Sequence, residues 1–300
     1  MIFCVSGDTH GALDRLYADV SEFERALKVR FEALLHVGDF GVWPDPEKID
    51  RATRDHEGAG DFPRWLADGR SAPRPTWFIK GNHEDFDWID SRKSTELLPG
   101  FHYVPNGRAV DLPDGKGAIR VAGLGGCYGP SDYERRKLQG YSKRHYTRWE
   151  VEALAGRRPI DILLLHDAPL GVTIVQKRAY GQERRYVSNA LGLDQAVASA
   201  RPQICFFGHH HARVTAEVAG VPCLGLNIVG RPGYLVAVDV PSSSREPWML
   251  LGEWPAPDAA YRPVWPKGST DPKEMGSVLD GSTPPIRTDY IASGPRPGAR

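Results

Sequence analysis

Short apolar runs that end in glycine and polar residues recur along the first 240 residues of the chain. Their length and their content of β-branched and aromatic residues are typical of buried strands. The clearest predicted strands cover residues 2–5, 34–37, 76–79, 101–104, 119–122, 160–165 and 203–207. Three more are predicted at residues 213–218, 222–228 and 234–238.

Between the first two runs, apolar residues recur every three or four positions, which predicts a helix over residues 13–27. Shorter helices are predicted near 62–67, 148–154 and 189–199. Strands that alternate with helices favour an α/β fold. Beyond Val240 the chain becomes rich in Pro, Ser and Gly. We therefore expect one domain over residues 1–240 and a tail over 241–300 that wraps the domain or is partly disordered.

Polar residues follow five of the predicted strands, at the point where each strand ends. They are Asp8 and His10, Asp39, Asn82 and His83, His166, and His209 and His211. Each has an ordinary explanation when taken singly, because an aspartate can cap a helix and a loop histidine is commonly a surface residue. Together, at the strand ends where α/β proteins place their chemistry, they indicate a functional site.

A metal site explains this combination of residue types. Buried carboxylates and imidazoles without a cation would be poorly satisfied. Oxygen and imidazole ligands without thiolate suit Mn, Fe, Zn or Mg rather than a structural zinc ion. Seven candidate ligands, namely these residues without His83, are too many for one tetrahedral ion. Two metal ions bridged by one carboxylate are therefore the simplest interpretation.

The same residues resemble the five ordered motifs of the calcineurin-like metallophosphoesterase superfamily. The motifs are Asp8-x-His10, Gly38-Asp39, Gly81-Asn82-His83-Glu84, His166 and Gly208-His209-x-His211, in that order over residues 1–211. The resemblance implies a four-layer αββα sandwich, in which two mixed β-sheets pack face to face between helices. It also implies that the chain hydrolyses phosphate esters through metal-activated hydroxide.

The resemblance further implies a role for each residue. One metal ion would be held by Asp8, His10, Asp39 and His211, and the other by Asp39, Asn82, His166 and His209. Asp39 would bridge the two ions, and His83 would be the general acid. His210 occupies a variable position and receives no role. The ions would be Mn, Fe or Zn.

The segment after Asp39 favours a phosphodiester substrate. Protein phosphatases of this superfamily carry Gly-Asp-x-Val-Asp-Arg-Gly, whose Arg holds a dianionic phosphate, whereas this chain has Val42 and Trp43 at the last Asp and Arg. The missing Asp also leaves open which carboxylate orients His83, with Glu84 and Asp85 nearby.

A closer resemblance is to RNA lariat debranching enzymes. It rests on residues 7–14, on Gly38-Asp39-Phe40, on Ser131-Asp132-Tyr133 and on residues 160–167. In that family the segment that corresponds to 128–149 is a substrate-recognition insert. Debranching enzymes carry Cys where this chain keeps Asp8, which favours a conventional two-metal site here.

Two basic, aromatic loops are candidates for substrate binding. The candidate residues are Arg135, Arg136, Lys143 and Arg144 in the first loop, and Lys177 and Arg178 in the second loop, over 176–186. Cations that meet phosphates and aromatic rings that stack on bases are typical of nucleic-acid grooves. The alternative is a solvated face with a few packed tyrosines.

The composition of the chain limits the classes of partner and the compartment that we expect for it. The formal net charge is zero, so unspecific binding to polyanions or to anionic membranes is not expected of the whole chain. No apolar run approaches the roughly 20 residues of a membrane span, and the N-terminus has the pattern of a strand rather than of a signal peptide. Four cysteines without a C-x-x-C pair indicate a reduced, cytoplasmic setting.

These observations predict a binuclear metal-dependent phosphodiesterase that acts on a nucleic acid or a nucleotide. One alternative is a phosphomonoesterase, including a protein Ser/Thr phosphatase, although the missing Arg at Trp43 speaks against it. The other alternative is a non-catalytic scaffold with the same fold, although the complete set of ligands speaks against it.

Overall fold

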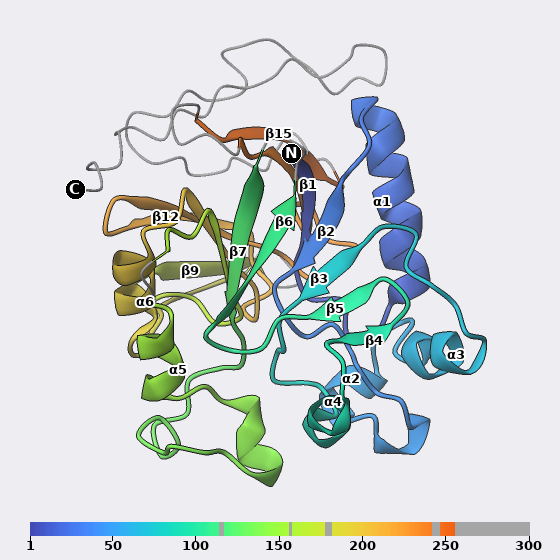
Figure 1. Ribbon diagram of the computed structural model, residues 1–300, viewed down its shortest axis with the longest axis horizontal. Helices are drawn as coiled ribbons and strands as arrows, with labels where there is room; N and C mark the ends of the chain where they lie inside the picture. Colours follow the sequence, from blue (N-terminus) through green and yellow to red (C-terminus); the bar gives the residue numbers. More distant parts are fainter. Residues whose placement is uncertain (114–116, 156–157, 178–181, 242–246, 256–300) are drawn as a thin grey trace.

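The computed structural model describes residues 1–113, 117–155, 158–177, 182–241 and 247–255, and it contains two mixed β-sheets (Figure 1). The seven-stranded first sheet has the order β15 (Met249–Trp254), β14 (Leu235–Asp239), β1 (Ile2–Ser6), β2 (Ala33–His36), β3 (Thr76–Phe78), β5 (Phe101–Tyr103), β4 (Glu96–Leu98). The six-stranded second sheet has the order β12 (Val214–Val218), β13 (Val221–Gly225), β11 (Ile204–Phe207), β8 (Ile162–Leu165), β7 (Ala118–Leu124), β6 (Arg108–Pro113).

Alternate residues of each central strand face opposite layers. In β1, Phe3 and Val5 belong to the core between the two sheets, whereas Cys4 packs on the outer side with α1 (Leu13–Leu27). In β8, Ile162 points into the same inner core and Leu163 packs on the outer side of the second sheet. Because both faces of these strands are covered, the sequence shows continuous apolar runs instead of an alternation.

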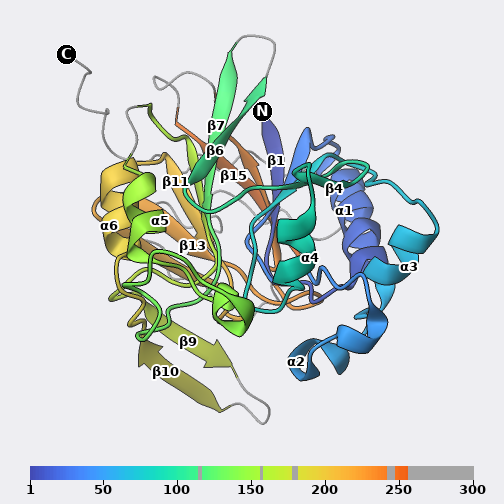
Figure 2. The same cartoon turned by 60° about the horizontal axis from the view of Figure 1, so that its bottom comes forward.

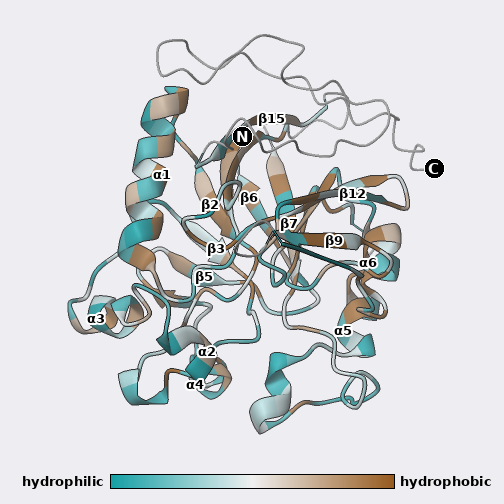
Figure 3. Ribbon diagram, turned by 180° about the vertical axis from the view of Figure 1, so that it is seen from behind, coloured by the Kyte–Doolittle hydropathy of each residue, from teal (hydrophilic) through white to brown (hydrophobic). Residues whose placement is uncertain are grey.

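Helices cover the outer face of each sheet, so the expected four-layer fold is confirmed. On the first sheet lie α1, α3 (Asp61–Ala67) and α4 (Phe86–Ser91), and on the second lie α5 (Arg148–Ala153) and α6 (Leu193–Ala200). Helix α1 buries residues at helical spacing, including Leu13, Leu16 and Val20. Figure 3 shows the matching mixture of hydrophobic and hydrophilic residues along α1. Each such buried side chain contributes about 1.5–3 kcal/mol.

Parallel pairing brings the functional strand ends to one edge. Strands β1, β2 and β3 are mutually parallel, and so are β7, β8, β11 and β13. The carboxyl ends of β1 to β3 therefore lie side by side, as do those of β8 and β11. The segments that follow β2 and β7 carry the short elements η1 (Pro46–Lys48), α2 (Arg51–Arg54) and η2 (Gly140–Arg144).

Two segments differ from the expectations. Residues 176–186, expected as a loop, belong largely to a separate hairpin of β9 (Thr173–Lys177) and β10 (Glu183–Val187), which projects from the body in Figure 2. Residues 249–254, assigned to the tail, form β15, which pairs antiparallel with β14. Leu250 packs into the core between the sheets, so the boundary predicted after Val240 is too early. Residues 256–300 lie outside the described part.

Among the described residues, no helix is both long enough and apolar enough to cross a membrane.

Candidate metal centre

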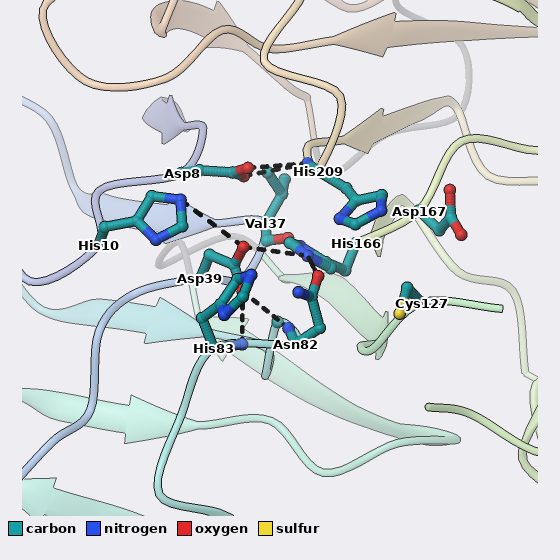
Figure 4. Close-up of polar contacts among 12 residues, drawn as sticks. Asp8, His10, Val37, Asp39, Asn82, His83, Cys127, His166, Asp167 and His209 are labelled. Atoms are coloured by element: carbon teal, nitrogen blue, oxygen red, sulfur yellow. Dashed lines mark hydrogen bonds and ion pairs between the residues drawn. The ribbon is translucent and has the colours of Figure 1, made fainter. Parts of the chain in front are cut away.

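The loops after five strands bring all seven predicted ligands to one place, as Figure 4 shows for six of them. Asp8, Asp39 and His166 are at most 1% exposed, and Asn82 is 4% exposed. Three groups of mutually close ligand atoms form here; one, Asp167, His209 and His210, lies at the side of the centre, and the other two consist of predicted ligands. These two are Asp8, His10, Asp39 and His211, and Asp39, His166 and His209. Both of them contain Asp39.

In the first group, ring nitrogens and carboxylate oxygens converge. Nε2 of His211 lies 3.1 Å from Oδ2 of Asp8 and 3.3 Å from Nε2 of His10. Nε2 of His10 lies 3.7 Å from Oδ2 of Asp39. The backbone N–H of His209 donates to the Asp8 carboxylate at 2.9 Å, which fixes that carboxylate against the second sheet.

In the second group, His166 is held in one orientation. Its Nδ1 donates to the carbonyl oxygen of Val37 at 2.9 Å, so its Nε2 faces the centre. That Nε2 lies 2.9 Å from Oδ1 of Asn82 and 3.5 Å from Oδ2 of Asp39. A nitrogen that faces two oxygen acceptors needs either a proton or a metal ion.

The pKa shifts of these groups likewise indicate that the site favours a positive charge. Burial raises the pKa of Asp39, but the imidazoles of His166 and His10 lower it well below its usual value. Burial lowers the pKa of His166, but the Asp39 carboxylate raises it to about 10. Burial lowers the pKa of His10 and of His209 to about 4, so both rings offer a lone pair at neutral pH. The set fits divalent cations bound by imidazole and oxygen ligands.

The backbone at these ligands is strained. His10, Asp39 and His211 have φ of 47°, 51° and 47°, and His209 has φ of 62°. Residues other than glycine rarely adopt this left-handed region, and each instance costs about 1–3 kcal/mol. Such strain clusters at functional sites, which supports the assignment of these turns to the centre.

Two glycines are required because a ligand from another motif packs against each. A Cβ atom at Gly81 would lie 2.0 Å from Oδ1 of Asp39, and one at Gly208 would lie 2.2 Å from Oδ1 of Asp8. Real Cβ atoms do not come this close to other atoms. Each of these glycines therefore leaves room for a carboxylate that follows a different strand.

This packing makes a prediction about Gly208. Gly208→Ala should displace the Asp8 carboxylate and weaken metal binding by about 10–100-fold, the range for changes directly behind metal ligands. Gly60→Ala is the control, because a Cβ there meets nothing within 4 Å. The measurement is metal content by mass spectrometry after dialysis, at matched circular dichroism. Equal metal content in the two variants would contradict the close-contact argument.

His83 lies beside the ligands, and Asp50 holds its ring. Nδ1 of His83 is 2.5 Å from Oδ2 of Asp50, and the ring centroid is 5.5 Å from that of His10. Burial lowers the pKa of His83, but the Asp50 carboxylate raises it above its usual value. Asp50 also caps α2 by accepting the N–H of Thr53. This local role explains Asp50 in the sequence and conceals its contact with His83.

The two carboxylates that the sequence suggested for this role are used elsewhere. Asp85 caps α4 by accepting the N–H of Trp88 at 3.0 Å. Glu84 is buried and accepts backbone N–H groups, including those of Phe40 at 2.9 Å and Val42 at 2.7 Å. It therefore fixes the loop that carries Asp39.

Two further histidines adjoin the centre without any sequence signal. The ring of His56 stacks on His10 at a centroid distance of 4.3 Å. His210, which had no predicted role, lies beside the ligand His209, with their ring centroids 5.0 Å apart. Its Nε2 lies 2.9 Å from Oδ1 of Asp167, and its Nδ1 lies 2.8 Å from the hydroxyl of Tyr186 on β10.

The predicted substrate-binding cations lie in different surroundings. Arg135 pairs with Asp132, Arg136 lies over the ring of Trp149, and Lys143 is bound by Asp87 and Asp90. Arg144 hydrogen-bonds Tyr141 and lowers the pKa of His83 through its charge. Arg178 and the side chain of Lys177 lie outside the described residues. The charge of Arg144 therefore reaches the general-acid candidate.

The fold and the ligand types together are those of metallophosphoesterases. Residues 1–213 match the calcineurin-like phosphoesterase family, and the chain belongs to that family. A solved crystal structure superimposes with a TM-score of 0.53 at 13% identity, covering 83% of this chain and 97% of the other, which supports the fold alone.

Curated relatives confirm the closer resemblance. The lariat debranching enzyme of Schizosaccharomyces pombe is 26% identical over 236 residues, which cover 71% of this chain and 49% of that protein. The lariat debranching enzyme of Arabidopsis thaliana is 27% identical over 248 residues, covering 73% and 56% respectively. The chain thus spans about half the length of the curated relatives it matches.

Proposed function

We propose that this protein is a binuclear metal-dependent phosphodiesterase. The observation that carries the proposal is the pair of ligand groups that share Asp39, with the paired His83 and Asp50 at their edge. One ion would be held by Asp8, His10, Asp39 and His211, and the other by Asp39, Asn82, His166 and His209. When bound, divalent ions such as Mn, Fe or Zn would supply a nucleophilic water near neutral pH and neutralise charge on the phosphate oxygens.

The protein side chains supply orientation and the proton. Because Nδ1 of His83 is engaged by Asp50, Nε2 is the atom that would donate a proton to the departing oxygen. Asp50 raises the pKa of His83, which favours the protonated form that a general acid requires. Val37, through its carbonyl oxygen, keeps the free nitrogen of His166 directed at the centre.

The local structure favours a phosphodiester over a phosphomonoester as the class of substrate. Val42 and Trp43 are buried where the protein-phosphatase branch has its Asp and Arg, so no guanidinium at position 43 can hold the second charge of a monoester. One observation favours the monoester alternative. Arg144 is half-buried near His83, and its Nε has no hydrogen-bond partner among the described residues.

The relatives suggest a nucleic-acid substrate. Both relatives described above are named lariat debranching enzymes, and we extend the class of substrate, an RNA phosphodiester, to this chain. The four cysteines are free and buried, which supports placement in a reducing compartment such as the cytoplasm.

The test compares bis-p-nitrophenyl phosphate with p-nitrophenyl phosphate on manganese-loaded protein. We expect kcat/KM to favour the diester by at least about tenfold, or about 1.4 kcal/mol of transition-state stabilisation. Preference for the monoester, lost in Arg144→Gln, would instead establish Arg144 as the phosphate-holding residue and the protein as a phosphomonoesterase.

A further inference from the structure

A large cleft lies apart from the ligand groups. It has a volume of about 1210 Å³ and runs between β5 of the first sheet and β6 of the second. Helices α4 and α5, at the lower centre and the lower left of Figure 1, contribute Asp90 and Trp149 to its walls. None of the seven candidate ligands lines it. We call it the lateral cleft.

The lateral cleft carries uncompensated positive charge. Its lining includes seven Lys and Arg residues but only three Asp and Glu residues. Five of these cations are exposed and form no ion pair among the described residues. They are Arg92, Lys93, Arg108, Arg136 and Lys137.

The acidic residues of the lining are already engaged. Asp87 and Asp90 bind the ammonium group of Lys143 at 2.8 and 2.5 Å. Glu150 closes the capping box of α5 with Thr147. An anionic ligand would therefore meet free cations rather than existing salt bridges, which raises its local concentration and its rate of association.

Aromatic groups lie among these cations. The ring of Trp149 lines the lateral cleft, and the guanidinium groups of Arg136 and Arg148 lie 4.0 and 4.3 Å from its centroid. The indole N–H of Trp149 is buried and has no hydrogen-bond partner among the described residues. Phe86 and Tyr103 also line the cleft. Cations that follow a backbone, beside aromatic rings that stack on bases, are typical of single-stranded nucleic-acid sites.

The turn η2 separates the lateral cleft from the general acid. Lys143 lines the cleft, whereas the charge of the next residue, Arg144, acts on His83. Similarly, Lys80 lines the cleft, and Asn82, two residues further on, belongs to the centre. Because η2 carries one residue at each site, a chain attached to the oxygen that His83 protonates would pass η2 on its way to the cleft.

We infer that the lateral cleft binds a single strand of nucleic acid, namely the segment that continues from the leaving group of the diester. The direction of the strand rests on the proposed phosphodiesterase function. The binding itself does not, because it depends on the cations and rings of the cleft. The substrate would accordingly be a polynucleotide rather than a mononucleotide.

The test reverses charge on both walls of the cleft. Arg92→Glu/Arg108→Glu is compared with the control Lys28→Glu/Arg30→Glu, which changes net charge equally at exposed positions beyond the carboxyl end of α1. Anisotropy of a fluorescein-labelled single-stranded phosphorothioate oligonucleotide of about twelve nucleotides gives Kd for the metal-loaded proteins. We expect Kd to rise at least about tenfold in the cleft variant, with a shallower salt dependence, and to stay within about twofold in the control.

Hydrolysis of bis-p-nitrophenyl phosphate separates this inference from the proposed function. Unchanged hydrolysis with weakened oligonucleotide binding supports both. If no protein hydrolyses the diester but the cleft variant still binds more weakly than the control, the cleft site stands and the proposed activity fails. Wild-type protein without measurable binding, or equal weakening in both variants, would overturn the cleft site.

Discussion

Replacing His83 with alanine should lower kcat for a phosphodiester by about 10²–10⁴-fold, the usual contribution of a general acid. Bound metal should be unchanged, because the His83 ring belongs to neither ligand group. The backbone N–H of His83, which donates to Asp39 at 2.9 Å, is kept in the variant. Steady-state kinetics and metal analysis of the same preparation check this. Activity equal to wild type would remove the proton-donating role from His83.

A second variant, Asp50→Asn, should shift the pH dependence of hydrolysis and not abolish hydrolysis. Asp50 raises the pKa of His83, so its loss lowers that pKa. The protonated ring is the active form, and the alkaline limb of the kcat–pH profile should therefore move to lower pH. Activity at acidic pH should be largely retained. An alkaline limb that stays in place would show that Asp50 serves only to cap α2.

Asp39→Asn should remove metal from both positions and abolish hydrolysis. Oδ2 of Asp39 faces His10 at 3.7 Å and His166 at 3.5 Å, so one carboxylate serves both ligand groups. Asparagine keeps the shape but loses the charge. We expect metal affinity to fall by more than about 100-fold. That factor is the upper end of the range for changes to residues that contact a metal ligand without binding the metal themselves.

The control for Asp39 is Asp61→Asn, a carboxylate only 9% exposed that pairs with Arg64 outside both groups. This variant should keep its metal under the same dialysis. If Asp39→Asn lost one ion and kept the other, the shared-ligand arrangement would be wrong, although separate ions could remain.

The parts of the site that the sequence predicts are those that follow buried strands. A strand such as residues 160–165 is recognisable because both of its faces are covered, so His166 is placed by local pattern alone. The family comparison confirms the fold and the class that this pattern indicated. The role of each ligand remains a prediction.

The parts that the sequence could not predict depend on the path of loops. Asp50 and His56 lie between β2 and α3, where no hydrophobic period indicates a direction. Their contacts with His83 and His10 arise only when that loop closes over the edge of the first sheet. Strand β15 was missed for another reason, since its few apolar residues follow a stretch rich in Pro and Ser.

The hydrogen bond from His209 to Asp8 spans 201 positions along the chain. Contacts between residues so distant in sequence form late, because the entropy of closing the intervening chain must be lost first. During synthesis Asp8, His10 and Asp39 leave the ribosome long before residues 208–211, and the strand that pairs with β1 on its other side, β14, follows later still. The centre therefore closes only at the end of folding, and a nascent chain has no complete ligand group with which to capture an ion prematurely.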